Sequence, residues 1–306
     1  MKLSRREWIR MGAGACLAPL SSSWSVLQAA DAPLILTTIP STGQQVPAVG
    51  IGTVDFGGDP TSAAMEPLGQ ILELFHSLGG QVIDTSPNYG NSEEVLGTLL
   101  ARLNLRDQVF MATKVDREDP VEGIERMESS IRQLGGNIDL MQVHNLRGTD
   151  AELETLMAWK AQGRFRYIGV TTHRTSQHAE MEQVMRKYPL DFIQVNYSVA
   201  DRAAAERVLP LAHDKGIAAL INRPFGNGDL FNAVKGVDVP AWAADFDAHS
   251  WGQIFLKFII SHPAATIPIP GMTKPRHVQD NMAAMTGRLP DDSQRREIER
   301  LMDSIL

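Results

Sequence analysis

Short apolar runs alternate with stretches of helical periodicity along most of the chain. In the first clear example, apolar residues recur at helical spacing from Met65 to Phe75 and are followed by the run Val82-Ile83. Apolar residues three or four positions apart mark one face of a helix, and a short apolar run marks a buried strand. The expected strands are 49–52, 82–83, 109–112, 138–143, 167–170, 192–195, 217–221 and 266–269. Eight strand-then-helix units are therefore predicted.

Strands that are apolar throughout are typical of parallel strands buried on both faces. Eight such units closing on themselves make an α/β fold of the (β/α)8 type, the TIM barrel. An N-terminal hairpin is expected before the first unit, from Leu34–Leu36 and Val46–Val49 with a turn between them. The alternative is an open doubly wound sheet, which needs a glycine-rich dinucleotide fingerprint after an early strand, and this sequence has none. The longest irregular stretch, 226–249, lies between the seventh strand and its helix.

Composition and charge narrow the classes of protein to which the chain can belong. With 306 residues, of which 43% are hydrophobic and 21% charged, it has the make-up of a globular protein. The formal net charge of −7 argues against general nucleic-acid binding, so we expect no nucleic-acid partner. Cys16 is the single cysteine, which excludes a disulfide framework and a cysteine-ligated metal site within the chain.

Residues 1–30 do not have the pattern of a folded domain. Basic residues up to Arg10 are followed by a short apolar stretch and then by a serine-rich segment that ends at Ala29-Ala30. This order is typical of an export signal, and the stretch is too short to anchor the chain stably in a membrane. The segment Ser4–Ile9, which contains Arg5-Arg6, resembles a bacterial twin-arginine signal, which routes folded proteins.

The resemblance predicts a domain layout and a location. We expect a twin-arginine signal peptide over residues 1–30 and the barrel over residues 31–306. The twin-arginine export machinery is then a partner, and the periplasm is the expected compartment. The alternative is that these residues are the basic, amphipathic start of a cytosolic protein.

Polar side chains stand where three successive predicted strands end. Asp84 ends the second strand and Tyr89 follows it five positions later. Lys114 ends the third strand and His144 ends the fourth. Because the carboxyl ends of barrel strands share one face, we expect these four side chains to meet in one pocket.

A phenol beside an ammonium group can act as a general acid near neutral pH. The ordinary pKa of a phenol is about 10, and a neighbouring cation lowers it. Asp84 would hold Lys114 charged, because a cation buried alone is costly. Tyr89 could then protonate an oxygen that gains negative charge, while His144 donates a second hydrogen bond to it. A carbonyl group receiving hydride is the simplest such acceptor.

Each of these residues, taken alone, has an ordinary structural interpretation. Asp84 could cap a helix, and Lys114 could be a solvated strand end. His144 could be a core histidine, and Tyr89 could pack within its loop. Their occurrence together on successive strand ends favours the catalytic interpretation.

The ordered set of motifs resembles the aldo-keto reductase family across nearly all of residues 34–290. Beside the four polar residues, the matching segments are 50–53 (GIGT), 112–114 (ATK), 169–173 (GVTTH), 194–197 (QVNY), 267–271 (IPIPG) and 280–281 (DN). The resemblance implies a TIM barrel and NADPH-dependent carbonyl reduction. It also implies a catalytic tetrad of Asp84, Tyr89, Lys114 and His144, with Tyr89 as the proton donor.

The resemblance assigns cofactor contacts as well, some of them with altered residues. Thr171 and Thr172 stand in place of the Ser-Asn pair that holds the nicotinamide carboxamide, and Gln194 matches a third contact to that group. Asn222 replaces the aromatic residue that stacks on the nicotinamide. The adjacent Arg223 could pair with the pyrophosphate as a bidentate guanidinium.

Further cofactor positions lie at the two ends of the barrel sequence. Gly52 and Thr53 match a backbone contact to the cofactor. After Gly271, the basic residues Lys274 and Arg276 stand within a few positions of those that hold the ribose 2′-phosphate in the family, which favours NADP while leaving NAD possible. Asp280 and Asn281 match a pair that contacts adenine, or are polar residues on an exposed helix face.

Fewer residues bear on the substrate. Val54 stands where many relatives place a tryptophan, so a wider pocket is expected there. Trp242, Phe246 and Trp251 of the long seventh loop either line the substrate site or pack within the loop, and both remain open.

Three functions fit these residues. A reductase of small aldehydes or ketones fits the tetrad best. A non-catalytic NADP-binding regulatory or partner subunit would fit the altered Thr172 and Asn222 positions. A metal-dependent barrel hydrolase would need His144, His173 and Asp84 as ligands, but no paired-histidine spacing supports it, and we expect no metal.

Overall fold

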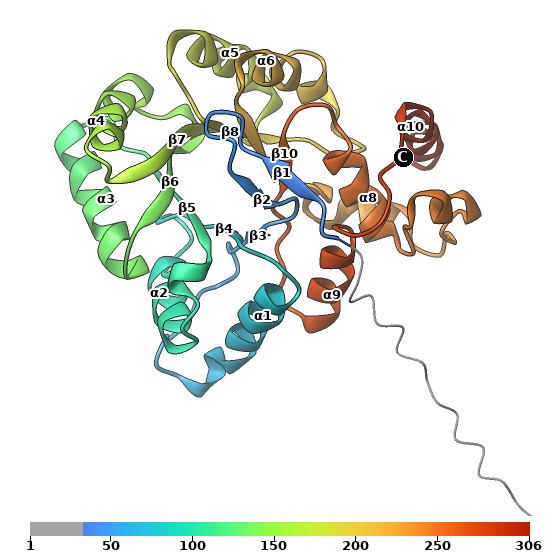
Figure 1. Ribbon diagram of the computed structural model, residues 1–306, viewed down its shortest axis with the longest axis horizontal. Helices are drawn as coiled ribbons and strands as arrows, with labels where there is room; N and C mark the ends of the chain where they lie inside the picture. The colour runs from blue at the N-terminus through green and yellow to red at the C-terminus, as the bar shows by residue number, and fades with distance from the viewer. Residues whose placement is uncertain (1–32) are drawn as a thin grey trace, which may run out of the picture. The chain divides into compact units, whose positions relative to one another are not determined.

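An eight-stranded parallel sheet closes into a barrel within residues 33–306, the part of the chain that the computed structural model describes (Figure 1). Each strand pairs in parallel with the next one along the chain. The strands are β3 (Ile51–Gly52), β4 (Val82–Asp84), β5 (Phe110–Val115), β6 (Ile138–Val143), β7 (Phe165–Thr171), β8 (Phe192–Asn196), β9 (Ala218–Asn222) and β10 (Thr266–Pro268). The barrel closes where Gly52 bridges Gly271 and its N–H donates to Pro270 O over 3.0 Å. The predicted TIM barrel is confirmed.

Helices surround the barrel (Figure 1). They are α1 (Glu66–Ser77), α2 (Ser92–Arg102), α3 (Pro120–Leu134), α4 (Thr149–Ala161), α5 (His178–Lys187), α6 (Val208–Lys215), α7 (Asp229–Ala233), α8 (Trp251–Ile260), α9 (Pro275–Ala283) and α10 (Asp292–Ile305). At α3 the local signals are plain: the Asp119 carboxylate accepts from the N–H groups of Val121 and Glu122, and Gly135 ends the helix with φ 67°. The apolar pattern predicted neither α7 nor α10. None of the helices in residues 33–306 has the length and apolar character needed to cross a membrane.

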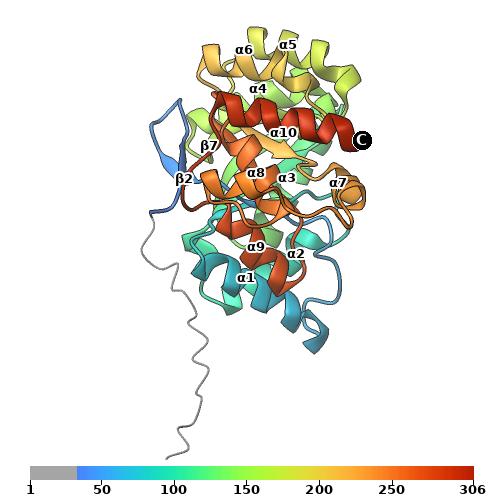
Figure 2. The same ribbon diagram turned by 90° about the vertical axis from the view of Figure 1, so that its right-hand side faces the viewer.

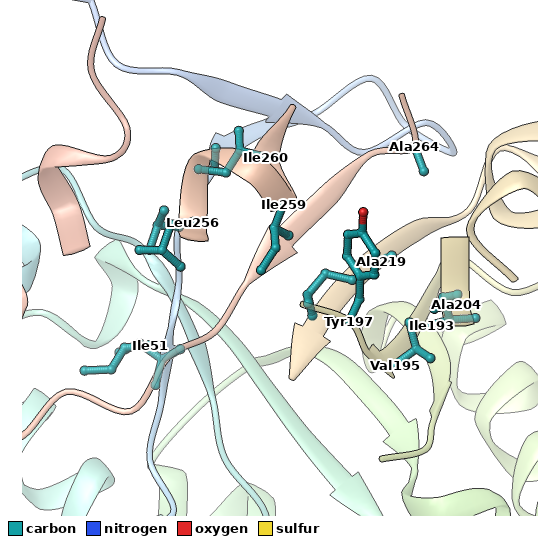
Figure 3. Close-up of a cluster of buried hydrophobic side chains, with 14 of the residues drawn as sticks. Ile51, Ile193, Val195, Tyr197, Ala204, Ala219, Leu256, Ile259, Ile260 and Ala264 are labelled. Atoms are coloured by element: carbon teal, nitrogen blue, oxygen red, sulfur yellow. The ribbon is translucent and has the colours of Figure 1, made fainter. Parts of the chain in front are cut away.

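Alternation along the strands separates two hydrophobic layers. Inward side chains fill the barrel as one cluster, which includes Val82, Phe110, Ala112, Leu140, Tyr167, Phe192, Leu220 and Ile267. Their neighbours on the same strands point outward into a second, larger cluster under the helices. Figure 3 shows part of that cluster, with Ile193 and Val195 of β8 and Ile259 of α8 among its members.

The predicted hairpin covers the end of the barrel at which the strands begin. Its strands, β1 (Leu36–Thr38) and β2 (Gln45–Pro47), pair antiparallel. Ile39 and Val46 join the cluster inside the barrel, and the Tyr167 hydroxyl donates to Gln44 Oε1 over 2.6 Å. Figure 2 shows the hairpin and α7 at opposite ends of the barrel. The end where the strands finish is therefore left free of the hairpin.

The long seventh loop is more regular than expected. It contains α7 and a 3-10 helix over Ala241–Phe246. Phe246 and Trp251 are buried in the outer hydrophobic cluster, and Trp242 packs against it. The three aromatic residues left open by the sequence therefore pack within the protein. The expected signal peptide, 1–30, lies outside the described residues.

Candidate active site

Every second residue of a barrel strand points inward, and at the carboxyl ends of the strands these inward residues are polar. Asp84 follows inward Val82 on β4, and Lys114 follows inward Ala112 on β5. Residues two apart on a strand point to the same side. The same register places further amides at the ends of β6, β8 and β9, namely Gln142, Gln194 and Asn222. A polar layer therefore follows directly on the apolar core.

Asp84 and Lys114 form a buried ion pair. Lys114 Nζ donates to Asp84 Oδ2 over 2.6 Å and to the Thr85 carbonyl oxygen over 2.7 Å, and the two side chains are 2% and 0% exposed for Asp84 and Lys114. Burial by itself lowers the pKa of Lys114, but the Asp84 carboxylate and the Tyr89 phenol outweigh it and raise that pKa above its ordinary value. Lys114 therefore stays charged at neutral pH.

Two amides hold the second oxygen of Asp84. Gln194 Nε2 donates to Oδ1 over 2.8 Å, and Gln142 Nε2 donates over 3.2 Å. With Lys114 on Oδ2, both carboxylate oxygens have donors, which fixes the orientation of the group. Gln142 was missed in the sequence, although it stands two residues after the inward Leu140 on β6 and therefore points to the same side.

Tyr89 lies beside the lysine, in the loop between β4 and α2. Its N–H donates to Ser86 O over 3.0 Å, and Gly90 turns the chain with φ 61°. Lys114 Nζ lies 5.1 Å from the centroid of the Tyr89 ring. The His144 ring stands edge-on to that ring, with the centroids 6.3 Å apart. The structure thus brings together the four residues that the strand ends suggested.

His144 is neutral at neutral pH. Burial and the Lys114 charge lower its pKa to about 4, although the Asp116 carboxylate opposes this change. Its Nδ1 lies 3.3 Å from the side-chain nitrogen of Asn88. A neutral imidazole has one N–H to donate, so His144 can offer a hydrogen bond without carrying charge.

These groups border a cavity of about 770 Å³. Asp84, Tyr89 and His144 line it, and so does Val54. Most of the expected cofactor contacts also line it: Gly52, Thr53, Thr171, Thr172, Gln194, Asn222, Arg223 and Gly271. The cavity is therefore shared by the expected catalytic and cofactor residues.

The remaining expected cofactor residues belong to α9 and its start. Lys274 and Arg276 are exposed there. Asp280 accepts a hydrogen bond from Ser250 Oγ over 2.9 Å, and Asn281 is buried. These four residues do not line the cavity that contains Tyr89.

Two of the altered positions have part of their polar groups engaged within the protein. The Thr172 hydroxyl donates to Gln177 Oε1 over 2.7 Å and accepts from the Arg174 N–H over 3.1 Å. Asn222 Nδ2 donates to the Thr172 carbonyl oxygen over 2.8 Å. Asn222 Oδ1 is buried and has no hydrogen-bond partner in the part of the chain that is described. This oxygen is the acceptor that the position offers to a ligand.

Strained backbone and aromatic side chains mark the rim of the cavity. Asn145, Arg223 and Asn227 line it and have φ values of 56°, 52° and 56°. Such conformations cost about 1–3 kcal/mol each in residues with a Cβ and tend to cluster at functional sites. Phe225 and Phe231, whose ring centroids lie 4.8 Å apart, add an aromatic wall that the sequence did not reveal.

The ligand set of the metal-hydrolase alternative is engaged in other bonds. Asp84 is paired with Lys114, and His173 Nδ1 lies 2.9 Å from Asn145 Oδ1. Among residues 33–306, no group of three or more His, Cys, Asp or Glu side chains is placed to hold a metal ion.

Comparison with known proteins identifies the family. The sequence profile of the aldo/keto reductase family matches residues 48–302, from just before β3 into α10. The chain belongs to the aldo/keto reductase family. Enzymes of this family are NAD(P)H-dependent oxidoreductases, and the matched residues include all four polar residues at the strand ends.

Individual aldo/keto reductases are similar to this chain at moderate identity. An NADH-specific methylglyoxal reductase of Escherichia coli (strain K12) is 28% identical over an alignment of 304 residues, which covers 79% of this chain and 91% of the relative. The aldo-keto reductase YhdN of Bacillus subtilis (strain 168) is 30% identical over 202 residues, which cover 60% of either protein. A Klebsiella pneumoniae aldo/keto reductase, solved in complex with NADP and acetate, superposes with a TM-score of 0.74 at 24% identity, over 87% of this chain and 94% of that one. The superposition shows the same fold.

Proposed function

We propose that this aldo/keto reductase reduces small aldehydes or ketones with NADPH, and that Tyr89 is the general acid. The main support is the position of Lys114, which Asp84 holds charged and which lies 5.1 Å from the centroid of the Tyr89 ring. A buried ammonium beside a phenol stabilises the phenolate that remains after the phenol has given up its proton. Tyr89 and His144 line the same cavity, so both can reach one substrate atom.

The proton step follows from these positions. NADPH, when bound, supplies a hydride to the carbonyl carbon, and the electron pair of the broken C=O π bond passes to the oxygen. The Tyr89 hydroxyl transfers its proton to that oxygen, so that the product is an alcohol. Lys114 balances the charge left on the phenol oxygen, and Asp84 keeps Lys114 in place. Neutral His144 donates a hydrogen bond to the same oxygen and orients it.

The cavity residues fit the nicotinamide end of such a cofactor. Asn222 Oδ1 is a buried acceptor without a partner in residues 33–306. Gln194 is bonded to Asp84 through Nε2, which leaves Oε1 as a second acceptor. A carboxamide carries the N–H groups that such acceptors require. Asn222 would then hold the nicotinamide by hydrogen bonding in place of stacking.

We propose NADP as the preferred cofactor, with NAD as the alternative. Solved structures of the same fold from Klebsiella pneumoniae hold NADP or NADPH, whereas the Escherichia coli relative is named as NADH-specific. The exposed cations Lys274 and Arg276 at the start of α9 are suited to a 2′-phosphate. Replacing both with alanine should weaken NADPH binding much more than NADH binding, as measured by nucleotide fluorescence titration. Equal losses for the two nucleotides would remove the support for NADP.

Turnover of carbonyl compounds tests the activity. The wild-type protein should oxidise NADPH in the presence of members of a panel of aldehydes and ketones. Tyr89→Phe should abolish this turnover while leaving the Kd for NADPH nearly unchanged, because the hydroxyl gives its proton to the substrate and not to the cofactor. A variant that keeps most of its turnover contradicts the assignment. A wild-type protein that binds NADPH but reduces none of the panel supports the alternative, a non-catalytic partner subunit.

We further propose that residues 1–30 export the chain, already folded, to the periplasm by the twin-arginine route. The support is the segment Ser4–Ile9 with its Arg5-Arg6 pair. Export after folding would allow the barrel to carry bound NADP out of the cytoplasm. Arg5→Lys with Arg6→Lys should hold the protein in the cytoplasm of a bacterial host, as measured by cell fractionation. Unchanged export, or exported wild-type protein free of nucleotide, would contradict the proposal.

A further inference from the structure

Asn88, the residue before Tyr89, connects His144 to charged groups outside the tetrad. Its side-chain nitrogen lies 3.3 Å from His144 Nδ1 and donates to Asp116 Oδ2 over 2.6 Å. Its side-chain oxygen accepts from an Arg126 guanidinium nitrogen over 3.0 Å. Asn88 also lines the cavity. All polar atoms of the Asn88 amide are therefore engaged at once.

These partners fix which end of the Asn88 amide faces His144. A guanidinium can only donate hydrogen bonds, so Arg126 must face the amide oxygen. A carboxylate can only accept, so Asp116 must face the amide NH2. Both partners require the same orientation, and turning the amide over would break both bonds. Arg126 is itself held by a second bond to the Pro87 carbonyl oxygen over 2.9 Å.

The fixed orientation of the Asn88 amide determines which nitrogen of the His144 imidazole carries hydrogen. Because the NH2 group of Asn88 points to Nδ1 of His144, that nitrogen must act as an acceptor and cannot carry hydrogen. In a neutral imidazole the hydrogen then resides on Nε2. Ser86 Oγ, 3.4 Å from the same Nδ1, accepts from the Asn88 N–H over 3.2 Å and is free to donate its own hydrogen to Nδ1. Both neighbours of Nδ1 are therefore compatible with this tautomer.

We propose that Asn88 is a positioning residue that holds His144 in the tautomer with hydrogen on Nε2, so that His144 donates to the substrate carbonyl oxygen. The proposal rests on the proposed carbonyl reduction for its purpose, although the tautomer itself can be observed without any turnover. Without an amide in this place, the Asp116 carboxylate, whose charge already acts on His144, would lose the NH2 group that it now accepts from. A carboxylate bonded to Nδ1 would require hydrogen on Nδ1, which leaves Nε2 as an acceptor that repels a carbonyl oxygen.

The tautomer is measured directly by NMR on the full-length protein labelled with 15N in its histidine rings. His144 is assigned by comparison with His144→Asn. At pH 7.5 we expect the His144 signals of a neutral ring with a bare Nδ1 and a protonated Nε2. A protonated Nδ1 in the wild-type protein would overturn the proposal. This result is independent of whether the enzyme reduces carbonyl compounds, so it stands even if the proposed function fails.

The variant Asn88→Asp places a carboxylate of almost the same shape beside His144 Nδ1 and should therefore reverse the tautomer. The new carboxylate accepts from Nδ1, so the neutral ring should carry its hydrogen there, and the pKa of His144 should rise. Lys114 and His173, which also act on this ring, remain in place, whereas Asp116, whose Oδ2 lies 2.6 Å from the Asn88 side-chain nitrogen, would share one proton with the new carboxylate. At pH 8.5 kcat should fall by roughly tenfold or more relative to wild type, because a donor to the developing oxyanion is lost. At lower pH the ratio to wild type should recover, since the imidazolium again carries hydrogen on Nε2.

Two further variants separate this effect from damage to the loop. Asn88→Leu removes the hydrogen bond without imposing the opposite tautomer, so its loss of kcat at pH 8.5 should be smaller than that of Asn88→Asp. Asn91→Leu is the matched control, since Asn91 lies in the same loop and bonds Gly58 and not His144. It should keep the wild-type tautomer and pH profile. An Asn88→Asp protein with wild-type His144 signals, or with a loss of kcat that does not depend on pH, would overturn the proposal.

Discussion

Lowering the pH from 7.5 to 5.0 should destabilise the protein through His144. In the folded chain, burial and the Lys114 charge lower the pKa of His144 to about 4. In the unfolded chain the pKa returns to about 6.5. Below pH 6.5 the unfolded chain therefore binds a proton that the folded chain does not, and the free energy of unfolding falls as the pH falls. The loss ends near pH 4, where the folded form binds the proton as well.

The size of the effect follows from the two pKa values. They differ by about 2.5, and each whole unit corresponds to about 1.4 kcal/mol, so the complete loss is about 3 kcal/mol. Integrated from pH 7.5 to pH 5.0, the part due to His144 is about 2 kcal/mol. Solvent screens this contribution little, because His144 is only 9% exposed.

Urea unfolding at both pH values, for wild type and His144→Asn, isolates this contribution. Other titrating groups act equally in both proteins, so the wild type should lose about 2 kcal/mol more than the variant. The exposed His249, whose side chain has no hydrogen bond within residues 33–306, provides the control: His249→Asn should follow the wild type. Equal losses in wild type and His144→Asn would refute the assignment of a neutral, buried imidazole.

Substitutions at three other places, namely the Asp84–Lys114 pair, Glu152 and Gly52, test further parts of the structure. Asp84→Asn should lower the free energy of unfolding, measured with urea, by about 3–5 kcal/mol, because it leaves the Lys114 charge buried and unpaired. Adding Lys114→Met should restore part of this loss. An Asp84→Asn protein as stable as the wild type would contradict the buried ion pair. Glu152 has its pKa raised to about 7, chiefly by burial, so the folded chain holds this proton more tightly than the unfolded chain. The wild type should therefore lose stability through Glu152 as the pH rises from about 4.5 to 7, and Glu152→Gln should remove this dependence. If the stability of the two proteins changes with pH in parallel, the raised pKa of Glu152 is contradicted. Gly52→Ala should destabilise the barrel by about 1–3 kcal/mol in thermal unfolding, because a Cβ at Gly52 would meet the Ile269 carbonyl oxygen at 2.8 Å. An unchanged Tm would contradict close packing of β3 against the segment after β10.

The strands and the four polar residues at their ends were predictable because one periodicity governs both. The run Ile138–Val143 was expected as a strand with these bounds, and β6 has them. Once such a strand is placed, its next residue, His144, must stand at the carboxyl end of the barrel. Asp84 and Lys114 follow in the same way from β4 and β5. Their meeting therefore required only the closure of the sheet.

Asn88 and Gln142 were missed because their roles depend on partners far away in the sequence. Asn88 meets Asp116, Arg126 and His144 across 28, 38 and 56 residues. Within its own segment, Pro-Asn-Tyr-Gly, it has only the appearance of a turn residue. No local pattern records such contacts, since the partners of Asn88 lie directly after β5, within α3 and directly after β6.

The helix α10 escaped prediction for a different reason. Its buried side is formed by Arg295, Ile298 and Met302, so a charged residue occupies a core position. The Arg295 guanidinium donates to Tyr197 Oη over 3.0 Å, a partner that lies on a different segment. The apolar residues at helical spacing, Ile298, Leu301, Met302 and Ile305, are confined to the second half of the helix, although the capping box from Asp291 to Gln294 marks its start.

Whether Lys114 works through Tyr89 can be decided by the rate of hydride transfer in single turnovers. Three proteins are compared with the wild type: Tyr89→Phe, the charge-neutral pair Asp84→Asn with Lys114→Met, and the combination of all three changes. Removing the ion pair should slow the wild-type reaction by about a hundredfold, but should hardly slow Tyr89→Phe further, because no phenolate is left to stabilise. If the two losses multiply in full, Lys114 does not act through the phenol of Tyr89, and the proposed proton transfer is wrong.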